Sequence, residues 1–72
     1  MTSTIQSVLF DKTIWSLDDA KKWLRQHRIV PIKKVHSTKY FYRFRIKEPN
    51  EFIRFITKKI AHGVELVIGF RS

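Results

Sequence analysis

The sequence predicts an α+β domain in which one main helix, at about residues 16–28, packs on a mostly antiparallel sheet of four to five strands. Apolar, β-branched and aromatic runs of strand length flank a single stretch with helical periodicity. That stretch opens with a capping sequence, and residues 39–47 alternate between two faces with a period of two. Because the chain has 72 residues, we expect a single domain over residues 1–72 with a small core.

The first predicted strand covers residues 5–10, an apolar run that ends at Asp11. Val8, Leu9 and Phe10 follow one another without a polar residue, which is typical of a strand covered on both faces. We therefore expect this strand in the middle of the sheet.

The predicted helix has a clear start and an indirect stop. Ser16 is a favourable N-cap residue, and Asp19 three residues later completes a variant of the capping box. Trp15, just before the cap, is placed to pack against the first turn. Pro31 forbids continuation of the helix beyond about residue 28. The stripe expected to face the core is Leu17, Ala20, Trp23, Leu24 and His27.

Residues 32–36 alternate weakly and predict a second strand, which a turn at residues 36–39 joins to a strand at 39–47 as an antiparallel hairpin. Alternation along the longer strand separates its side chains into two sets. The core set is Tyr40, Tyr42, Phe44 and Ile46. The solvent set places four cations around one aromatic ring and consists of Lys39, Phe41, Arg43, Arg45 and Lys47.

Residues 52–60 fit two structures. One is a helix capped at Asn50 that ends at Gly63. The other is a single helical turn after Pro49 followed by a strand at about residues 54–60, which β-branched and aromatic residues favour. We predict the strand, turning through residues 61–63 into a last strand at 64–70.

Charge gives the main indication of function. Fifteen Lys and Arg residues against six Asp and Glu give a net charge of +9. Between residues 20 and 47 there are ten basic residues and no acidic one. Such a field attracts polyanions. The ten are Lys21, Lys22, Arg25, Arg28, Lys33, Lys34, Lys39, Arg43, Arg45 and Lys47.

These ten cations, with Phe41, form the predicted nucleic-acid-binding surface. Contacts from Lys and Arg to phosphates supply most of the affinity of non-specific binding, and Arg43 and Arg45 can make bidentate contacts. Phe41 either stacks on an exposed base or belongs to a small apolar patch. We predict non-specific binding of double-stranded DNA. The alternative is a structural or interaction protein that binds an acidic protein partner.

No enzyme, cofactor or metal site is predicted. His27, His36 and His62 are isolated in the sequence, and the chain has no cysteine. No apolar run approaches the roughly 18 residues of a membrane span, and the first residues are not those of a secretion signal. We therefore expect an intracellular protein that binds neither membranes nor a small-molecule substrate. Because a small sheet leaves unpaired edges, we also expect a homodimer.

Four segments stand out together: Ser7-Val8-Leu9-Phe10, Trp15-Ser16-Leu17-Asp18-Asp19-Ala20-Lys21-Lys22-Trp23-Leu24, Tyr42-Arg43-Phe44-Arg45 and Gly63-Val64-Glu65-Leu66-Val67-Ile68-Gly69. They resemble a module in proteins of tailed phages and large double-stranded DNA viruses, and a stand-alone form of this length is similar to small proteins of marseillevirus-type giant viruses. The resemblance covers about residues 7–70, supports the hairpin at 54–70 and implies a location in the host cell and/or virion, with association with particles or genomes. It implies no catalytic residue. Where a glycine usually follows the helix, this chain has Arg28-Ile29-Val30.

Overall fold

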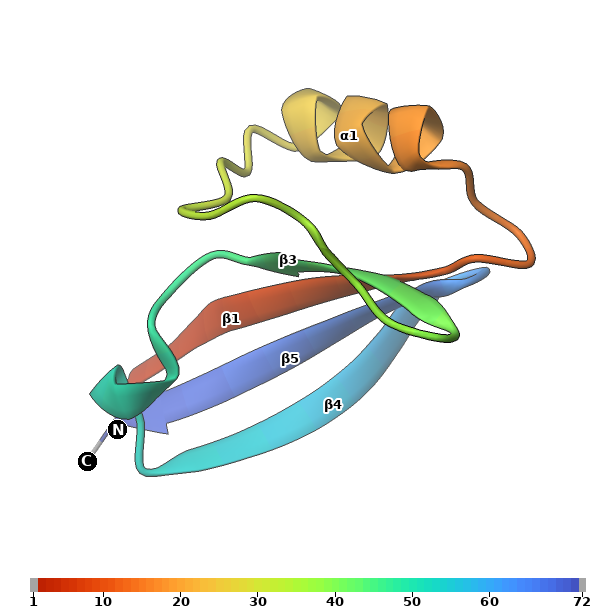
Figure 1. Cartoon of the computed structure of the whole chain (residues 1–72). Coiled ribbons are helices and arrows are strands. Elements are labelled where there is room, and N and C mark those ends of the chain that lie inside the picture. The colour runs from red at the N-terminus through yellow and green to blue at the C-terminus, as the bar shows by residue number, and fades with distance from the viewer. Residues whose placement is uncertain (1, 72) are drawn as a thin grey trace.

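The computed structural model describes residues 2–71 and shows one α-helix lying over a five-stranded antiparallel sheet (Figure 1). The order of strands in the sheet is β2-β3-β1-β5-β4. The predicted α+β class, with one main helix and an antiparallel sheet, is confirmed. The elements are β1 (Thr2–Asp11), α1 (Leu17–Gln26), β2 (His36–Ser37), β3 (Phe41–Arg45), the 3₁₀ turn η1 (Pro49–Glu51), β4 (Arg54–Ala61) and β5 (Val64–Arg71).

The core lies between α1 and one face of the sheet. The fully buried ring of Phe10 makes edge-to-face contacts with Trp15, Trp23 and Phe44, at centroid distances of 5.2, 5.6 and 5.6 Å. This cluster joins β1 to α1 and β3. The other buried side chains of the core are Val8, Ala20, Leu24 and Val64.

β1 lies in the middle of the sheet, as predicted, with β3 on one side and β5 on the other. A β-bulge interrupts its pairing with β5 between Ile5 and Ser7. At the bulge, the carbonyl of the buried Gln6 accepts hydrogen bonds from the N–H groups of Ile46 and Lys47, at 2.8 and 3.1 Å. Because both N–H groups converge on one carbonyl, the ladder stops and β3 ends at Arg45 rather than at residue 47.

The start of α1 follows the prediction. Ser16 Oγ accepts a hydrogen bond from the N–H of Asp19 at 3.1 Å. The indole Nε1 of Trp15 donates to the carbonyl of His62 at 2.9 Å, which ties the helix start to the β4–β5 turn. In the preceding turn, the N–H and hydroxyl of Thr13 donate to the Asp11 carboxylate and lower the pKa of that carboxyl below its usual value.

α1 ends without a glycine, because Arg28 itself adopts the left-handed conformation, with a φ of 56°. The N–H of Ile29 donates to the carbonyl of Leu24 at 2.9 Å, and that of Arg28 to the carbonyl of Arg25 at 3.1 Å. This is the Schellman pattern of a helix C-terminus. His27, predicted to face the core, is exposed, and its ring stacks on the outer side of Trp23 at a centroid distance of 3.8 Å.

Replacing Arg28 with glycine should stabilise the fold by about 0.5–1 kcal/mol, because glycine adopts the left-handed conformation without the cost of a Cβ. Arg28→Ala is the matched control, since it removes the same charge and keeps the Cβ. Urea unfolding should give a higher midpoint for R28G than for R28A and the natural chain. Equal midpoints for the two variants would contradict this account of the helix end.

β2 is shorter than the strand predicted at residues 32–36, because only His36 and Ser37 pair with β3. The chain before them packs Ile29 and Val35 against the core instead of continuing the ladder. One bond of ladder type remains there, from the N–H of Ile32 to the carbonyl of Arg45 at 2.9 Å.

The two faces of β3 agree with the predicted alternation, although the strand is five residues long rather than nine. Tyr42, Phe44 and Ile46 pack in the core. Tyr40, predicted with them, is 62% exposed, because it lies in the turn before β3 begins.

The strand alternative for residues 52–60 is confirmed: one 3₁₀ turn, η1, leads into the β4–β5 hairpin. β4 forms the far edge of the sheet and is exposed at every residue (Figure 1). It is the edge at which a second copy would extend the sheet, and the homodimer stays a prediction that sedimentation velocity can measure. Among residues 2–71, no helix has the length and apolar character needed to cross a membrane.

Candidate nucleic-acid interface

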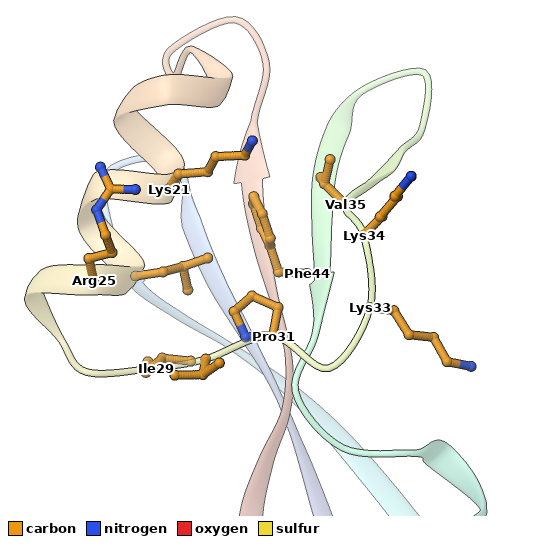
Figure 2. Close-up of a pocket in the computed structure, with 10 residues that line it drawn as sticks. Lys21, Arg25, Ile29, Pro31, Lys33, Lys34, Val35 and Phe44 are labelled. Carbon is orange, nitrogen blue, oxygen red and sulfur yellow. The ribbon is translucent and has the colours of Figure 1, made fainter.

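A groove of about 560 Å³ lies between α1 and residues 29–35, which run alongside the helix (Figure 2). We call it the α1 groove. Its rims are basic, with Lys21 and Arg25 on the helix and Lys33 and Lys34 on the facing segment. Its apolar lining consists of Leu24, Ile29, Val30, Pro31, Val35 and Phe44. An elongated anion with some apolar surface fits this combination.

A smaller pocket of about 230 Å³ adjoins the α1 groove, because Lys33 and Lys34 line both hollows. Arg43 and Arg45 lie on the face of β3 that points away from α1, and His36 pairs with Arg43 in the β2–β3 ladder. Every residue that lines this basic pocket therefore carries a basic side chain: Lys33, Lys34, His36, Arg43 and Arg45.

One carboxylate partly balances this charge. Glu48, in the segment after β3, forms ion pairs with Lys33 at 3.1 Å and with Arg45 at 3.7 Å. All three side chains are partly exposed, so each pair contributes little stability, about 0–1 kcal/mol. Within residues 2–71, no ion pair neutralises Lys34 or Arg43, and the basic pocket keeps a net positive charge.

Arg43 has one buried donor without an acceptor. Its Nε atom is inaccessible to solvent and has no hydrogen-bond partner in the described part of the chain. Buried polar groups in folded proteins nearly always have a partner, so this unpaired donor is an exception in the fold.

The structure brings together six of the cations predicted to bind nucleic acid. These line the α1 groove or the basic pocket and are Lys21, Arg25, Lys33, Lys34, Arg43 and Arg45.

The other predicted residues lie elsewhere. Lys22 lines a separate hollow beside Trp15 and Trp23. Lys39 lies over the ring of Tyr40 in the β2–β3 turn, at 5.3 Å. Arg28 and Lys47 are exposed beyond the ends of α1 and β3, and Phe41 is partly buried at the start of β3.

Two features of the site are missing from the sequence prediction. His36 lies in the basic pocket, although the sequence shows it as an isolated histidine. The predicted hairpin did not indicate this, because a turn at residues 36–39 sets His36 opposite Lys39, whereas in the structure His36 pairs with Arg43. The apolar floor of the α1 groove was not predicted either, since residues 32–36 were expected to form a strand.

The chemistry of both hollows is that of anion binding. Lysine supplies a mobile point charge and arginine a planar fork of donors, and both suit phosphate and carboxylate groups. Within residues 2–71, no three His, Cys, Asp or Glu side chains are grouped to hold a metal ion.

Comparison with known proteins gives no match to a family model, a curated protein or a solved structure.

Proposed function

We propose that this protein binds double-stranded DNA without sequence specificity, through the α1 groove and the basic pocket. The observation that carries the proposal is that Lys33 and Lys34 line both hollows. Three successive segments of the chain (α1, residues 33–34 and β3) contribute the cations. A phosphate backbone that lies across them gains affinity by releasing its counterions.

The lining residues include no side chain that typically reads adenine. Neither hollow is lined by Asn or Gln, and the Lys and Arg residues there can contact phosphates as well as guanine. The cations of the groove rims are exposed, which suits contacts with a regular backbone. In the viral setting implied by the resemblance, this activity is that of a virion or genome-packaging accessory.

The apolar floor of the α1 groove favours a second candidate, an acidic protein segment. Such a segment would place apolar side chains against Leu24, Ile29 and Phe44 and its carboxylates beside Lys21 and Arg25. A phosphate backbone uses the rims of the groove but gains little from this floor. The protein would then be a structural or interaction component of the virion or its assembly machinery.

Titration with random-sequence duplexes separates the two candidates. If about five cations contact phosphates, the slope of log affinity against log salt should be near −4.5. Two unrelated sequences of equal length should bind with affinities that agree within about twofold, because the contacts are to the backbone. Fluorescence anisotropy at several salt concentrations measures both quantities. Absence of duplex binding at low salt would refute the DNA proposal and favour the acidic protein partner.

A further inference from the structure

We infer that the basic pocket binds one phosphate group. This deepens the proposed function and rests on it for the source of that group, which is either a diester of the DNA backbone or a terminal or free phosphate. The proposal concerns only the pocket formed by Lys33, Lys34, His36, Arg43 and Arg45, and not the α1 groove beside it.

The size of the pocket suits a compact ion. Its volume of about 230 Å³ is below the roughly 300–1,000 Å³ of pockets that hold drug-sized ligands. The α1 groove, at about 560 Å³, falls inside that range. The basic pocket therefore has room for a phosphate and a few water molecules, while the rest of a nucleic-acid chain extends along the groove.

The donors surround the pocket from two segments. Arg43 and Arg45 come from alternate positions of β3, so both guanidinium groups lie on the same face of the strand. Lys33 and Lys34 approach from the segment before β2. A tetrahedral phosphate can accept a bidentate contact from an arginine and single contacts from the lysines. Glu48 offers only one carboxylate against these four cations.

The unpaired Nε of Arg43 distinguishes this pocket from an ordinary charged surface. On an ordinary surface, water satisfies the donors of a guanidinium, but this Nε is closed to solvent and has no partner within residues 2–71. Because this Nε is closed to solvent, a phosphate oxygen would accept from it only once the Arg43 side chain rotates to expose it. Binding there would then combine charge attraction with a directional hydrogen bond.

Titration with inorganic phosphate, followed by NMR, tests the pocket without DNA. We expect the Nε–H signal of Arg43 and the backbone amide signals of Lys34 and Arg45 to shift in a saturable way. Lys34→Gln should weaken phosphate binding about tenfold, the effect of losing one charge-assisted contact. Lys58→Gln on β4 removes the same charge at the opposite edge of the sheet and should change binding less than about twofold.

Arg43→Lys keeps the positive charge and removes the planar fork of donors. Weaker phosphate binding by this variant could therefore not be attributed to a change in net charge. We expect it to weaken phosphate binding about as much as Lys34→Gln does. If Arg43→Lys binds like the natural chain, or if Lys34→Gln and Lys58→Gln weaken binding equally, phosphate only samples the general positive field and the proposal is overturned.

Two duplexes of one sequence, with 5′-phosphate or 5′-hydroxyl ends, identify the source of the phosphate. Tighter binding of the phosphorylated duplex assigns the pocket to a terminal phosphate. Equal binding that Lys34→Gln weakens assigns it to a backbone diester. Saturable phosphate shifts without duplex binding would refute the proposed DNA binding and support the phosphate site. Duplex binding without phosphate shifts would support DNA binding and refute the phosphate site.

Discussion

Reversing both arginines of β3, as Arg43→Glu with Arg45→Glu, should lower duplex affinity by at least about a hundredfold. Each arginine that contacts a phosphate contributes a charge-assisted hydrogen bond of about 1.5–3 kcal/mol, and each 1.4 kcal/mol is about tenfold in affinity. The two glutamates would also repel the backbone. The salt slope should become shallower by roughly two, since two phosphate contacts are lost. Anisotropy titration of one duplex at several salt concentrations measures both changes.

The matched control is Arg54→Glu with Lys58→Glu, which changes the net charge by the same amount. Both residues are exposed on β4, at the opposite edge of the sheet from the basic pocket. We expect this variant to lose less than about tenfold, through the weaker general field alone. Equal losses in the two double variants would show that net charge, and not the position of the cations, determines binding. Thermal unfolding should accompany both titrations, because the Arg54 guanidinium lies over the ring of Phe70 at 4.9 Å.

The sequence was sufficient to predict those helix and strand boundaries that depend on interactions between residues close together in the chain. Ser16 and Asp19 mark the helix start because the capping bond spans only three residues. The β4–β5 hairpin follows from β-branched runs on either side of Gly63, which adopts a positive φ of 75° in the turn. These predictions depend on no contact between distant parts of the chain.

The lengths of β2 and β3 depend on distant contacts and were predicted wrongly. β3 stops at Arg45 because the next two N–H groups, of Ile46 and Lys47, both donate to the carbonyl of Gln6, which lies at the bulge some forty residues earlier. The sequence around Gln6 carries no glycine or other mark of a bulge. In the same way, residues 32–35 alternate like a strand, yet Val35 packs against the core and leaves the ladder.

The sequence predicted which cations belong to the candidate site, but not that they line a common pocket. The run of cations without acidic residues identified Arg43, Arg45, Lys33 and Lys34 individually. Their convergence on one pocket depends on the pairing of β2 with β3 and on the irregular path before β2. The orphaned Nε of Arg43 is a property of packing alone, and composition cannot indicate it.

The segment between β3 and β4 positions Glu48 beside the basic pocket, and Phe52 anchors that segment to the sheet. The ring of Phe52 is 8% exposed and lies over Gly69 of β5. The Arg71 guanidinium covers the ring at 5.2 Å, and Phe55 contacts it edge-to-face at 5.8 Å. Gly69 is needed here for space, because a Cβ at this position would clash with the ring of Phe52.

The effect of Gly69→Ala on stability should therefore depend on whether the Phe52 ring is present. In the natural chain, Gly69→Ala should destabilise the fold by about 1–3 kcal/mol, because the new methyl group and the ring cannot both be accommodated. Phe52→Ala should cost about 3 kcal/mol through lost burial. In the Phe52→Ala background, Gly69→Ala should be neutral or stabilising by up to about 1 kcal/mol, because it then only restricts the unfolded chain.

A double-mutant cycle by urea unfolding measures this coupling. The free energy of unfolding of so small a domain is only about 5 kcal/mol, so the cycle is best run in sucrose, which favours the folded state of every variant. Additive costs would show that the ring does not lie over Gly69. A non-additive cycle would confirm the contact, and Phe52→Ala should then also weaken the pairing of Glu48 with Lys33 and Arg45, because the segment that carries Glu48 loses its anchor. Looser pairing leaves the basic pocket more positive, so this variant should bind duplex DNA as well as the natural chain or better, provided that it is folded.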